Sequence, residues 1–390
     1  MKPARDVYIV GVGMIKYGRY PEKSVVELGA EGVITALKDA NMTMKDIQMA
    51  ASGNLSAPVG QAILKVVGQT GIPMVNVSNA CATGSTACRE AYFSVASGAY
   101  DVAMGIGSEQ MGKVGLLGGG GGGGGRGLGG GGGFDPAYIS EGLLGSGTMP
   151  SVFSQWGVEH MRKYGTTFED FARVAYKNHK NSVHNPYAQY QQEFSMEEIM
   201  NARMISWPNT LYMCCPTGDG AGAVIYASAE KARQYGAKAV KVAACVLTSD
   251  PWTESGNAIL DINEVTRLAA KEAYELAGLG PEDLNVAELH DCFATAEMLH
   301  YENLGFAPEG EGPRYLREGK FDIGGKVAMN ASGGLISRGH PLGCTGACGI
   351  AEIVWQLREE SGGRQQPGAK AGLAHVIGLT SACTINVMTK

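Results

Sequence analysis

The sequence lacks a long uninterrupted run of apolar residues. No stretch of the 390 residues approaches the roughly 20 apolar residues that a membrane-spanning helix requires, and no N-terminal segment joins a basic start to a long apolar run. We therefore predict a cytoplasmic protein that makes no contact with a membrane.

Positive charge is also scarce. Asp and Glu number 38 against 32 Lys and Arg, which gives a formal net charge of −6 and a pI near 5.7. Binding to the phosphate backbone of a nucleic acid requires a broad basic surface. The sequence therefore disfavours a nucleic-acid partner, and an anionic ligand would need a local basic patch.

The nine cysteines lack the spacing of a disulfide framework or a zinc site. Their number is odd, and the adjacent pair Cys214-Cys215 has neither CxxC spacing nor a second pair that would complete four ligands. We expect free thiols in a reducing compartment and no bound metal.

An internal repeat is present. Residues 36–50 align with residues 273–287 at a constant offset of 237, and both predict a helix, a break at Asn41 or Gly278, a short turn with an aspartate, and a strand. Matching strands are predicted ahead of these helices, at residues 7–12 and 240–247. The pattern indicates an α/β protein of two similar halves with a parallel or mixed sheet in each.

A segment of different composition separates the halves. Residues 118–133 are all glycine except Arg126 and Leu128, which predicts a flexible loop. The polar, helical segment that follows predicts an inserted cap, and the first half should end in a strand at residues 222–227. The predicted boundaries are 1–112 for the first part of the N-terminal half, 113–208 for the loop and cap, 209–236 for the end of that half, and 237–390 for the C-terminal half.

Cys81 lies between a predicted strand and a helix of small residues. The amide groups and the dipole at a helix N-terminus stabilise a thiolate, which is the nucleophilic form of cysteine. Covalent catalysis through Cys81 is therefore one interpretation. The alternative is a buried cysteine that packs as a small apolar group, which is common in intracellular proteins.

Two later segments carry titratable side chains in similar positions. His290 and Cys292 follow a predicted strand from residue 286 and precede a helix, and His340 precedes Pro341 and a helix marked by apolar spacing at residues 350–357. A lone histidine is usually a surface or satisfied core residue. Three strand-to-helix junctions with Cys, His plus Cys, and His favour one shared crevice, because open α/β sheets bind ligands at the carboxyl ends of their strands.

The cap also carries a basic pair, Arg162 and Lys163, on a predicted amphipathic helix. These side chains are candidates to contact an anionic ligand. The alternative is that they are solvated charges on a helix surface.

Together these motifs resemble the thiolase superfamily, in particular thiolases of the sterol carrier protein type. The resemblance covers nearly the whole chain, and the glycine tract departs from it. It rests on the motifs Ser78-Asn79-Ala80-Cys81-Ala82-Thr83-Gly84-Ser85, His290-Asp291-Cys292-Phe293 and Gly339-His340-Pro341-Leu342-Gly343.

The resemblance implies a five-layered α-β-α-β-α fold, an assembly of at least two copies such as a homodimer or a tetramer of dimers, and coenzyme A thioester substrates with no tightly bound cofactor. It also implies roles for the matched residues. Cys81 would be the acylated nucleophile, His340 its base, Cys292 the second acid and base, and His290 a holder of the oxyanion.

One motif of many thiolases is missing. Their second cysteine lies in a Cys-x-Gly turn near the C-terminus, but residues 374–383 contain no such turn. Cys383 is expected to pack in a strand, the acid and base role passes to Cys292, and Gly378 is a candidate to donate its backbone N–H to a second oxyanion site.

Three activities fit this set of residues. The first is a thiolase that cleaves or forms the C2–C3 bond of a 3-oxoacyl-CoA through an acyl-enzyme, with aromatic residues of the predicted cap such as Phe134, Tyr138 and Trp156 suggesting a bulky or aromatic acyl group. The second is a thiolase-like retro-aldolase acting on a 3-hydroxyacyl-CoA, against which the intact Cys81 argues. The third is a noncatalytic acyl-CoA-binding scaffold.

The resemblance also suggests a partner. A small subunit with a zinc ribbon and an OB fold is a further hypothesis.

Overall fold

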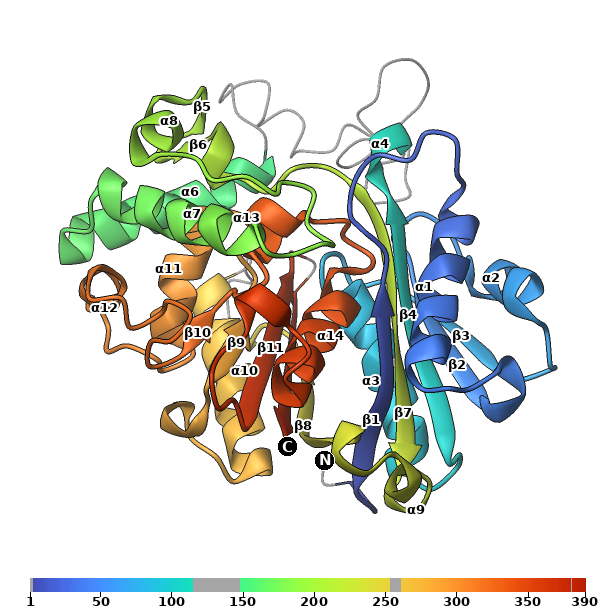
Figure 1. The fold of residues 1–390 in the computed structure, drawn as a ribbon. Coiled ribbons are helices and arrows are strands. Elements are labelled where there is room, and N and C mark those ends of the chain that lie inside the picture. Colours follow the sequence, from blue (N-terminus) through green and yellow to red (C-terminus); the bar gives the residue numbers. More distant parts are fainter. Residues whose placement is uncertain (1–2, 115–147, 253–260, 380) are drawn as a thin grey trace.

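Ten strands form one mixed β-sheet in the part of the chain that the structure describes. This computed structural model describes residues 3–114, 148–252, 261–379 and 381–390 (Figure 1). The strand order is β10-β9-β11-β12-β8-β1-β7-β4-β2-β3. The strands are β1 (Val7–Met14), β2 (Met49–Gly53), β3 (Met74–Val77), β4 (Val102–Gln110), β7 (Asp219–Ser228), β8 (Val240–Thr248), β9 (Val286–Glu288), β10 (Ala328–Met329), β11 (Ala371–Gly378) and β12 (Ala382–Thr389).

The sheet consists of two five-stranded halves with the same internal order. One half runs β3-β2-β4-β7-β1 and the other β10-β9-β11-β12-β8, and in both the first three strands are parallel and the remainder antiparallel. The halves join where β1 pairs with β8 through Tyr8↔Lys241 and Ile9↔Val240. The similar halves and the mixed sheet predicted from the sequence are both present.

The repeat also holds at the level of single elements. Helix α1 (Val25–Asp39) begins 237 positions before α10 (Ile262–Ala277), and the 3₁₀ turns η1 (Met44–Asp46) and η5 (Pro281–Asp283) keep the same offset. Asn41 and Gly278, the two predicted breaks, have φ values of 51° and 66°. A left-handed residue cannot continue a right-handed helix, so both helices end at equivalent positions.

Helices divide the molecule into five layers (Figure 1). Helices α1 and α2 (Gly60–Val67) cover the outer face of the N-terminal half-sheet, and α10 and α11 (Ala294–Asn303) lie on the outer side of the other half. Between the half-sheets, α3 (Thr83–Ala96) packs against α14 (Thr345–Arg358). This is the predicted α-β-α-β-α arrangement.

Helix α14 is buried on every side in the central layer. All of its residues are buried, including Glu352, whose carboxylate accepts two hydrogen bonds from the Arg364 guanidinium at 2.8 and 3.0 Å. A helix buried on every side must be apolar all round or pair its charges. The predicted apolar positions at residues 350–357 therefore lie in the core.

Within residues 148–210, which the structure describes, the segment between the halves forms three α-helices and a small hairpin. These are α6 (Thr148–Tyr164), α7 (Phe168–Ser182), α8 (Met196–Asn201), β5 (Met204–Ser206) and β6 (Asn209–Thr210). Helices α6 and α7 pack on α11, and α7 also contacts α13 (Gly334–Arg338), so this cap rests on the C-terminal half (Figure 1). The glycine tract at residues 118–133, Phe134 and Tyr138 lie outside the described residues.

The return strand is longer than predicted. It begins at Asp219 and ends at Ser228, whereas the sequence indicated residues 222–227, because glycine and small residues at its start hid the strand pattern. The remaining short elements are α4 (Met111–Val114), η3 (Leu211–Met213), α9 (Ala229–Ala232), η4 (Arg233–Lys238), α12 (Gly312–Arg317) and η6 (Gly362–Arg364). None of the described helices is long and apolar enough to cross a bilayer.

A buried carboxylate ties the two halves together near the ends of their strands. Glu109, on β4, accepts hydrogen bonds from the Asn54 side chain at 3.1 Å and the Leu55 amide at 3.0 Å, and from the amide of Gly343 in the other half. Burial raises the pKa of Glu109 to about 7, although these donors lower it. The loop that contains His340 and Gly343 is thus held to the N-terminal half by the Glu109 side chain, whose pKa is raised.

We predict that Gly346→Ala destabilises the fold and Gly349→Ala does not. A Cβ at Gly346 would lie 2.5 Å from the backbone nitrogen of Ser85 on α3, whereas at Gly349 the nearest atoms are 3.9 Å away. Overpacking costs about 1–3 kcal/mol, and alanine is favoured over glycine in a helix by up to about 1 kcal/mol. Urea unfolding of both variants measures the difference, and equal stability would contradict the tight α3–α14 contact.

We also predict a pH-dependent stability difference between the wild type and Glu109→Gln. Because the folded chain keeps the Glu109 proton up to about pH 7 while an unfolded glutamate releases it near pH 4.5, the folded state binds more protons in this interval. The wild type should therefore lose up to roughly 3 kcal/mol of unfolding free energy, relative to the glutamine variant, between pH 5 and 8. Glu230→Gln, at an exposed position, is the control, and its unfolding free energy should change with pH as that of the wild type does. A difference between Glu109→Gln and the wild type that stays the same at every pH would refute the prediction.

Candidate active site

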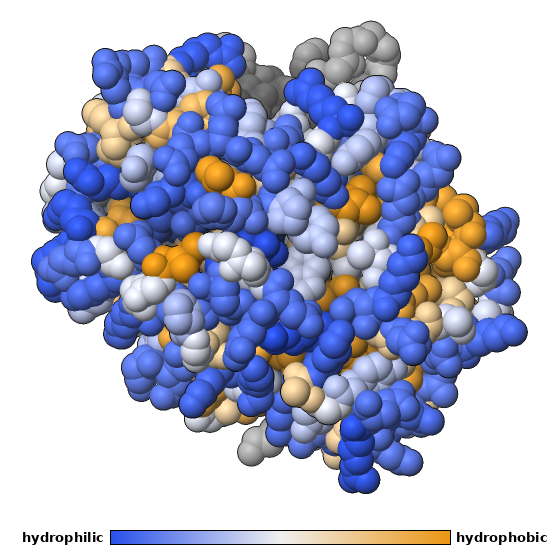
Figure 2. Space-filling view, in the orientation of Figure 1, coloured by the Kyte–Doolittle hydropathy of each residue, from blue (hydrophilic) through white to orange (hydrophobic). Residues whose placement is uncertain are grey.

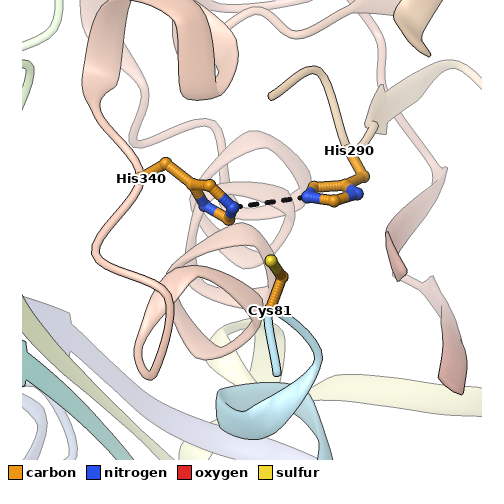
Figure 3. Close-up of side chains that lie close together, drawn as sticks. All are labelled: Cys81, His290 and His340. Atoms are coloured by element: carbon orange, nitrogen blue, oxygen red, sulfur yellow. Dashed lines mark hydrogen bonds between the residues drawn. The ribbon is translucent and has the colours of Figure 1, made fainter. Parts of the chain in front are cut away.

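Three predicted residues meet at the centre of the molecule. The Cys81 sulfur and one nitrogen each of His290 and His340 lie within 4.8 Å of one another, and the two Nε2 atoms are 3.4 Å apart. Figure 3 shows the sulfur pointing towards the gap between the two imidazoles. All three side chains are buried, with 1–3% of each residue exposed. The structure thus brings together residues that are more than 200 positions apart in the chain.

A tight turn between β3 and α3 places Cys81. Ala80 has a φ of 48°, and the Thr83 hydroxyl accepts from the Asn79 amide at 2.8 Å and donates to the Ala80 carbonyl at 2.6 Å. A non-glycine residue at positive φ is uncommon and is maintained here by the surrounding hydrogen bonds. The turn ends at the N-terminus of α3, so the sulfur lies where the sequence predicted it.

Burial keeps Cys81 uncharged, contrary to the prediction of a thiolate. Loss of hydration, with a smaller contribution from the nearby Glu109, raises the pKa of its thiol to about 12, despite the lowering by the backbone N–H group of Cys81. The thiolate that we expected at a helix N-terminus is therefore wrong for the substrate-free site. The resting group is a thiol that needs a base.

His340 is oriented by the residue that begins α14. Its Nδ1 atom lies 2.8 Å from the Thr345 hydroxyl, which donates to the Pro341 carbonyl at 3.0 Å. Because that hydroxyl proton is used, Nδ1 must be the donor and Nε2 carries the free lone pair. Burial, with a contribution from Arg338, lowers the pKa of His340 to about 3, so its resting form is neutral.

One part of the sequence prediction for His340 is wrong. The residue does not follow a strand, because α13 separates it from β10, and it lies on a loop between α13 and α14. The helix was hidden by the glycines at its start, Gly333 and Gly334, which have φ values of 93° and 60°. Two strand-to-helix junctions and one helix-to-helix loop therefore form the site.

His290 follows β9 and completes the cluster. Since Nε2 of His340 is an acceptor, Nε2 of His290 carries the proton between them, and Nδ1 of His290 has no partner among the described residues. Burial first, and then the neighbouring histidines His340, His375 and His300, lower its pKa far below the usual range. The His290 N–H group therefore points into the site as a neutral donor.

Asp291 fixes the relation between the two histidine loops, which the sequence analysis did not predict. Its carboxylate accepts from the amides of Leu335 and Ile336, at 2.7 and 3.2 Å, and from the Asn178 side chain at 2.8 Å. It therefore anchors the start of α13, which leads to His340, to the cap helix α7. The signal in the sequence was an aspartate between two predicted site residues.

The cap also reaches the site through a buried ion pair. Lys177 on α7 pairs with Glu297 on α11 at 2.9 Å, and Glu297 accepts from Asn178 at 2.6 Å and from the Tyr301 hydroxyl at 2.5 Å. A helix of the predicted cap thus contributes polar groups that support the loop of Asp291.

Cys292 lies beside the cluster and has another thiol as a neighbour. Its carbonyl accepts from the Cys215 amide at 2.9 Å, and Phe293 forms a β-bridge with Cys214. Burial, followed by the proximity of Cys215 and Cys81, raises the pKa of Cys292 well above its usual value. Cys292, to which the resemblance assigns the role of second acid and base, is therefore a protonated thiol in the substrate-free site.

Two residues of the C-terminal hairpin complete the surroundings of the nucleophile. A Cβ at Gly378 would lie 2.2 Å from the Asn79 carbonyl, so this glycine packs directly under the Cys81 turn. Val376 joins the apolar cluster that contains Cys81, at the position where a Cys-x-Gly turn would carry its cysteine. Cys383 is fully buried in the core on β12, which agrees with strand packing.

The structure does not bring Arg162 and Lys163 to the described part of this site. Both lie at the exposed end of α6, where Arg162 pairs with Glu159 and Lys163 with Glu309. Lys163 lines a separate cavity of about 270 Å³ between α6, α10 and α11, and none of the four predicted catalytic residues lines that cavity. Their role towards an anionic ligand stays a prediction.

Two family models and several known proteins match this chain. The family model "Thiolase, N-terminal domain" matches residues 7–120, and "Thiolase C-terminal domain-like" matches residues 255–389. Sterol carrier protein 2 of Homo sapiens is 40% identical over 98% of this chain and 72% of its own length. Benzoylsuccinyl-CoA thiolase subunit BbsB of Thauera aromatica is 37% identical over 97% of this chain and 96% of its own.

Solved structures share the fold. The Ltp2-ChsH2(DUF35) aldolase superposes with a TM-score of 0.83 at 24% identity, over 99% of this chain and 98% of that chain. Human mitochondrial 3-ketoacyl-CoA thiolase in complex with CoA superposes with a TM-score of 0.73 at 15% identity, over 100% and 99%. The protein is an acyltransferase with coenzyme A as a substrate. From its family models and relatives, the chain belongs to the thiolase family.

Proposed function

We propose that this protein cleaves or forms the C2–C3 bond of a 3-oxoacyl-CoA by acyl transfer through Cys81 to coenzyme A. The observation that carries the proposal is the convergence of the Cys81 thiol with the neutral imidazoles of His290 and His340 in a buried site. A thiol, an adjacent base and an oriented N–H donor are the groups that covalent acyl transfer requires.

In the first half-reaction, the His290 N–H group turns from Nε2 of His340 to the substrate oxygen, the lone pair on that Nε2 takes the Cys81 proton, and the thiolate adds to the C3 carbonyl. The Thr345 hydroxyl and the Pro341 carbonyl behind Nδ1 stabilise the imidazolium that forms. The His290 N–H group holds the oxyanion. The C2–C3 bond then breaks, Cys292 protonates the departing enolate, and Cys81 retains the acyl group.

In the second half-reaction, the Cys292 thiolate takes the proton of incoming coenzyme A, whose sulfur attacks the acyl group on Cys81. The Cys81 sulfur leaves and recovers its proton from His340, so both thiols and both imidazoles return to their starting forms. The backbone N–H of Gly378, against the Cys81 turn, is our candidate donor for the second oxyanion. The same groups serve condensation in the reverse direction.

The substrate proposal rests on the wall of the site. Phe153 of α6 packs edge-on to His290 with ring centroids 6.1 Å apart and stacks on Phe293 at 5.3 Å. One aromatic side chain of the cap therefore borders His290, the residue to which we assign the oxyanion. Together with the benzoylsuccinyl-CoA thiolase relative, this favours a bulky or aromatic acyl group and a role in fatty or aromatic acid degradation in the cytoplasm.

Two kinds of protein partner belong to the proposal. Strand β3 is at the open edge of the sheet, its Val75 is 40% exposed, and Figure 2 shows apolar residues gathered over α2 and β3. An open strand edge and an apolar surface suit pairing with a second copy of the chain as a homodimer. A small partner with a zinc ribbon and an OB fold is supported by the subunit and DUF35 names of two relatives.

We predict that Cys81 is acylated stoichiometrically by a 3-oxoacyl-CoA and that Cys81→Ala is not. Cys292→Ala is the matched variant: a simple acyl-CoA should still acylate its Cys81, because coenzyme A can leave as a thiolate even without the proton that Cys292 would give it, whereas an enolate cannot leave so easily, and turnover of a 3-oxoacyl-CoA should fall by at least about 100-fold. Peptide mass spectrometry locates the adduct. Turnover without any adduct on Cys81 would support a retro-aldolase, and the absence of both would support a scaffold.

We further predict that Thr345→Val lowers kcat by about 10-fold or more with little change in KM, whereas Thr345→Ser restores it. Valine keeps the shape but removes the hydroxyl that fixes the His340 tautomer, so the base and not substrate binding is impaired. Steady-state kinetics with a panel of 3-oxoacyl-CoA esters measures both constants. A change confined to KM would assign Thr345 a role in binding.

A further inference from the structure

We propose that Cys81, His290 and His340 also form a binding site for a thiophilic divalent cation such as Zn²⁺, and that the bound cation keeps the substrate-free enzyme inactive. The inference goes beyond the proposed function, because it concerns the affinity of these side chains for a metal in the absence of any substrate. It revises the expectation of no metal site, which rested on sequence spacing alone.

The spacing of the ligand atoms supports tetrahedral coordination. With Zn–N bonds of about 2.05 Å, two imidazole nitrogens on a tetrahedral zinc lie about 3.4 Å apart. The Nε2 atoms of His290 and His340 are 3.4 Å apart. A Zn–S bond of about 2.3 Å places sulfur about 3.6 Å from each nitrogen. The sulfur and one nitrogen of each histidine lie within 4.8 Å of one another, so the Cys81 sulfur must approach by no more than about 1.2 Å.

The donor set is one that zinc prefers. One thiolate and two imidazoles form a three-ligand site of the kind that leaves the fourth position open to water, and borderline-soft ions bind such sets better than Mg²⁺ or Ca²⁺. The site is closed to bulk solvent, since each ligand residue is at most 3% exposed.

The surroundings orient one imidazole for a metal and oppose the other. The Thr345 hydroxyl accepts from Nδ1 of His340, which is the outer contact that metal-bound histidines usually have. His290 must move its proton from Nε2 to Nδ1, which has no partner among the described residues. That cost weakens binding and suits a reversible site better than a permanent structural one.

Binding requires no change of oxidation state. The Cys81 S–H bond breaks, its proton leaves to solvent, and the sulfur and the two imidazole nitrogens form bonds to the metal, so one thiolate and one divalent ion leave a complex of charge +1. A lone pair of the bound sulfur is then shared with the metal, which slows its attack on a substrate or an alkylating agent relative to a free thiolate.

The test uses Co²⁺ as a spectroscopic probe with the whole chain in the absence of substrate. We expect a sulfur-to-cobalt charge-transfer band and intense visible bands typical of a tetrahedral ion, together with release of one proton per ion in calorimetry. Zn²⁺ should displace the Co²⁺ and protect Cys81 from iodoacetamide, as judged by mass spectrometry.

Variants separate this site from the other thiols. Cys81→Ala should abolish the charge-transfer band and weaken Co²⁺ binding by roughly 100-fold or more, whereas Cys88→Ala, at a buried position on α3 outside the cluster, should retain both. Circular dichroism confirms that each variant is folded. A band that survives in Cys81→Ala, or that disappears only in Cys215→Ala or Cys292→Ala, would overturn the proposal. Since no turnover is measured, the result does not depend on the thiolase activity.

Discussion

The contact between helices α3 and α14 in the central layer is the constraint on which the site depends. Cys81 lies two positions before the first residue of α3, and His340 lies five positions before the first residue of α14. The helices are pseudo-equivalent, and the approach of Gly346 to Ser85 leaves no room for a side chain between them. Each half therefore brings one candidate catalytic residue to the same place, and His290 joins them from the end of β9.

Burial at this place determines the chemistry that is possible. Away from water, the charged forms of a thiol and of an imidazole are both disfavoured, so Cys81 and His340 rest as a neutral pair. In the proposed mechanism, proton transfer between them becomes favourable when a substrate carbonyl develops negative charge nearby. The oriented donors then replace solvent as the stabilising environment. A neutral resting site also avoids the repulsion that an uncompensated buried charge would add.

The cap contributes more than cover. Asn178 connects Asp291 with Glu297, and Lys177 balances the charge of Glu297. Buried carboxylates are tolerated only when such partners satisfy them. This network holds the start of α13 in place and, through it, the loop of His340. The inserted segment and the C-terminal half therefore act as one structural unit around the histidines.

The sequence by itself determined much of this protein. The repeat at an offset of 237 predicted the two halves, and Asn41 and Gly278 marked the equivalent helix ends, because left-handed backbone positions are a local property. The cysteine and histidine motifs identified Cys81, His290, Cys292 and His340 as candidates. Fold and family followed from these local patterns.

Only the tertiary structure decided which groups meet and in what state. Protonation depends on burial and on neighbours distant in the chain, so the thiol form of Cys81 could not be predicted from the helix that follows it. Asn178 and Cys215 come from segments in which no motif pointed to the site. Arg162 and Lys163 lie away from the described part of the site, because helix periodicity predicts which residues share a face but not which segment packs against that face. Local sequence specifies local backbone, whereas desolvation and hydrogen-bond partners arise when separate segments pack together.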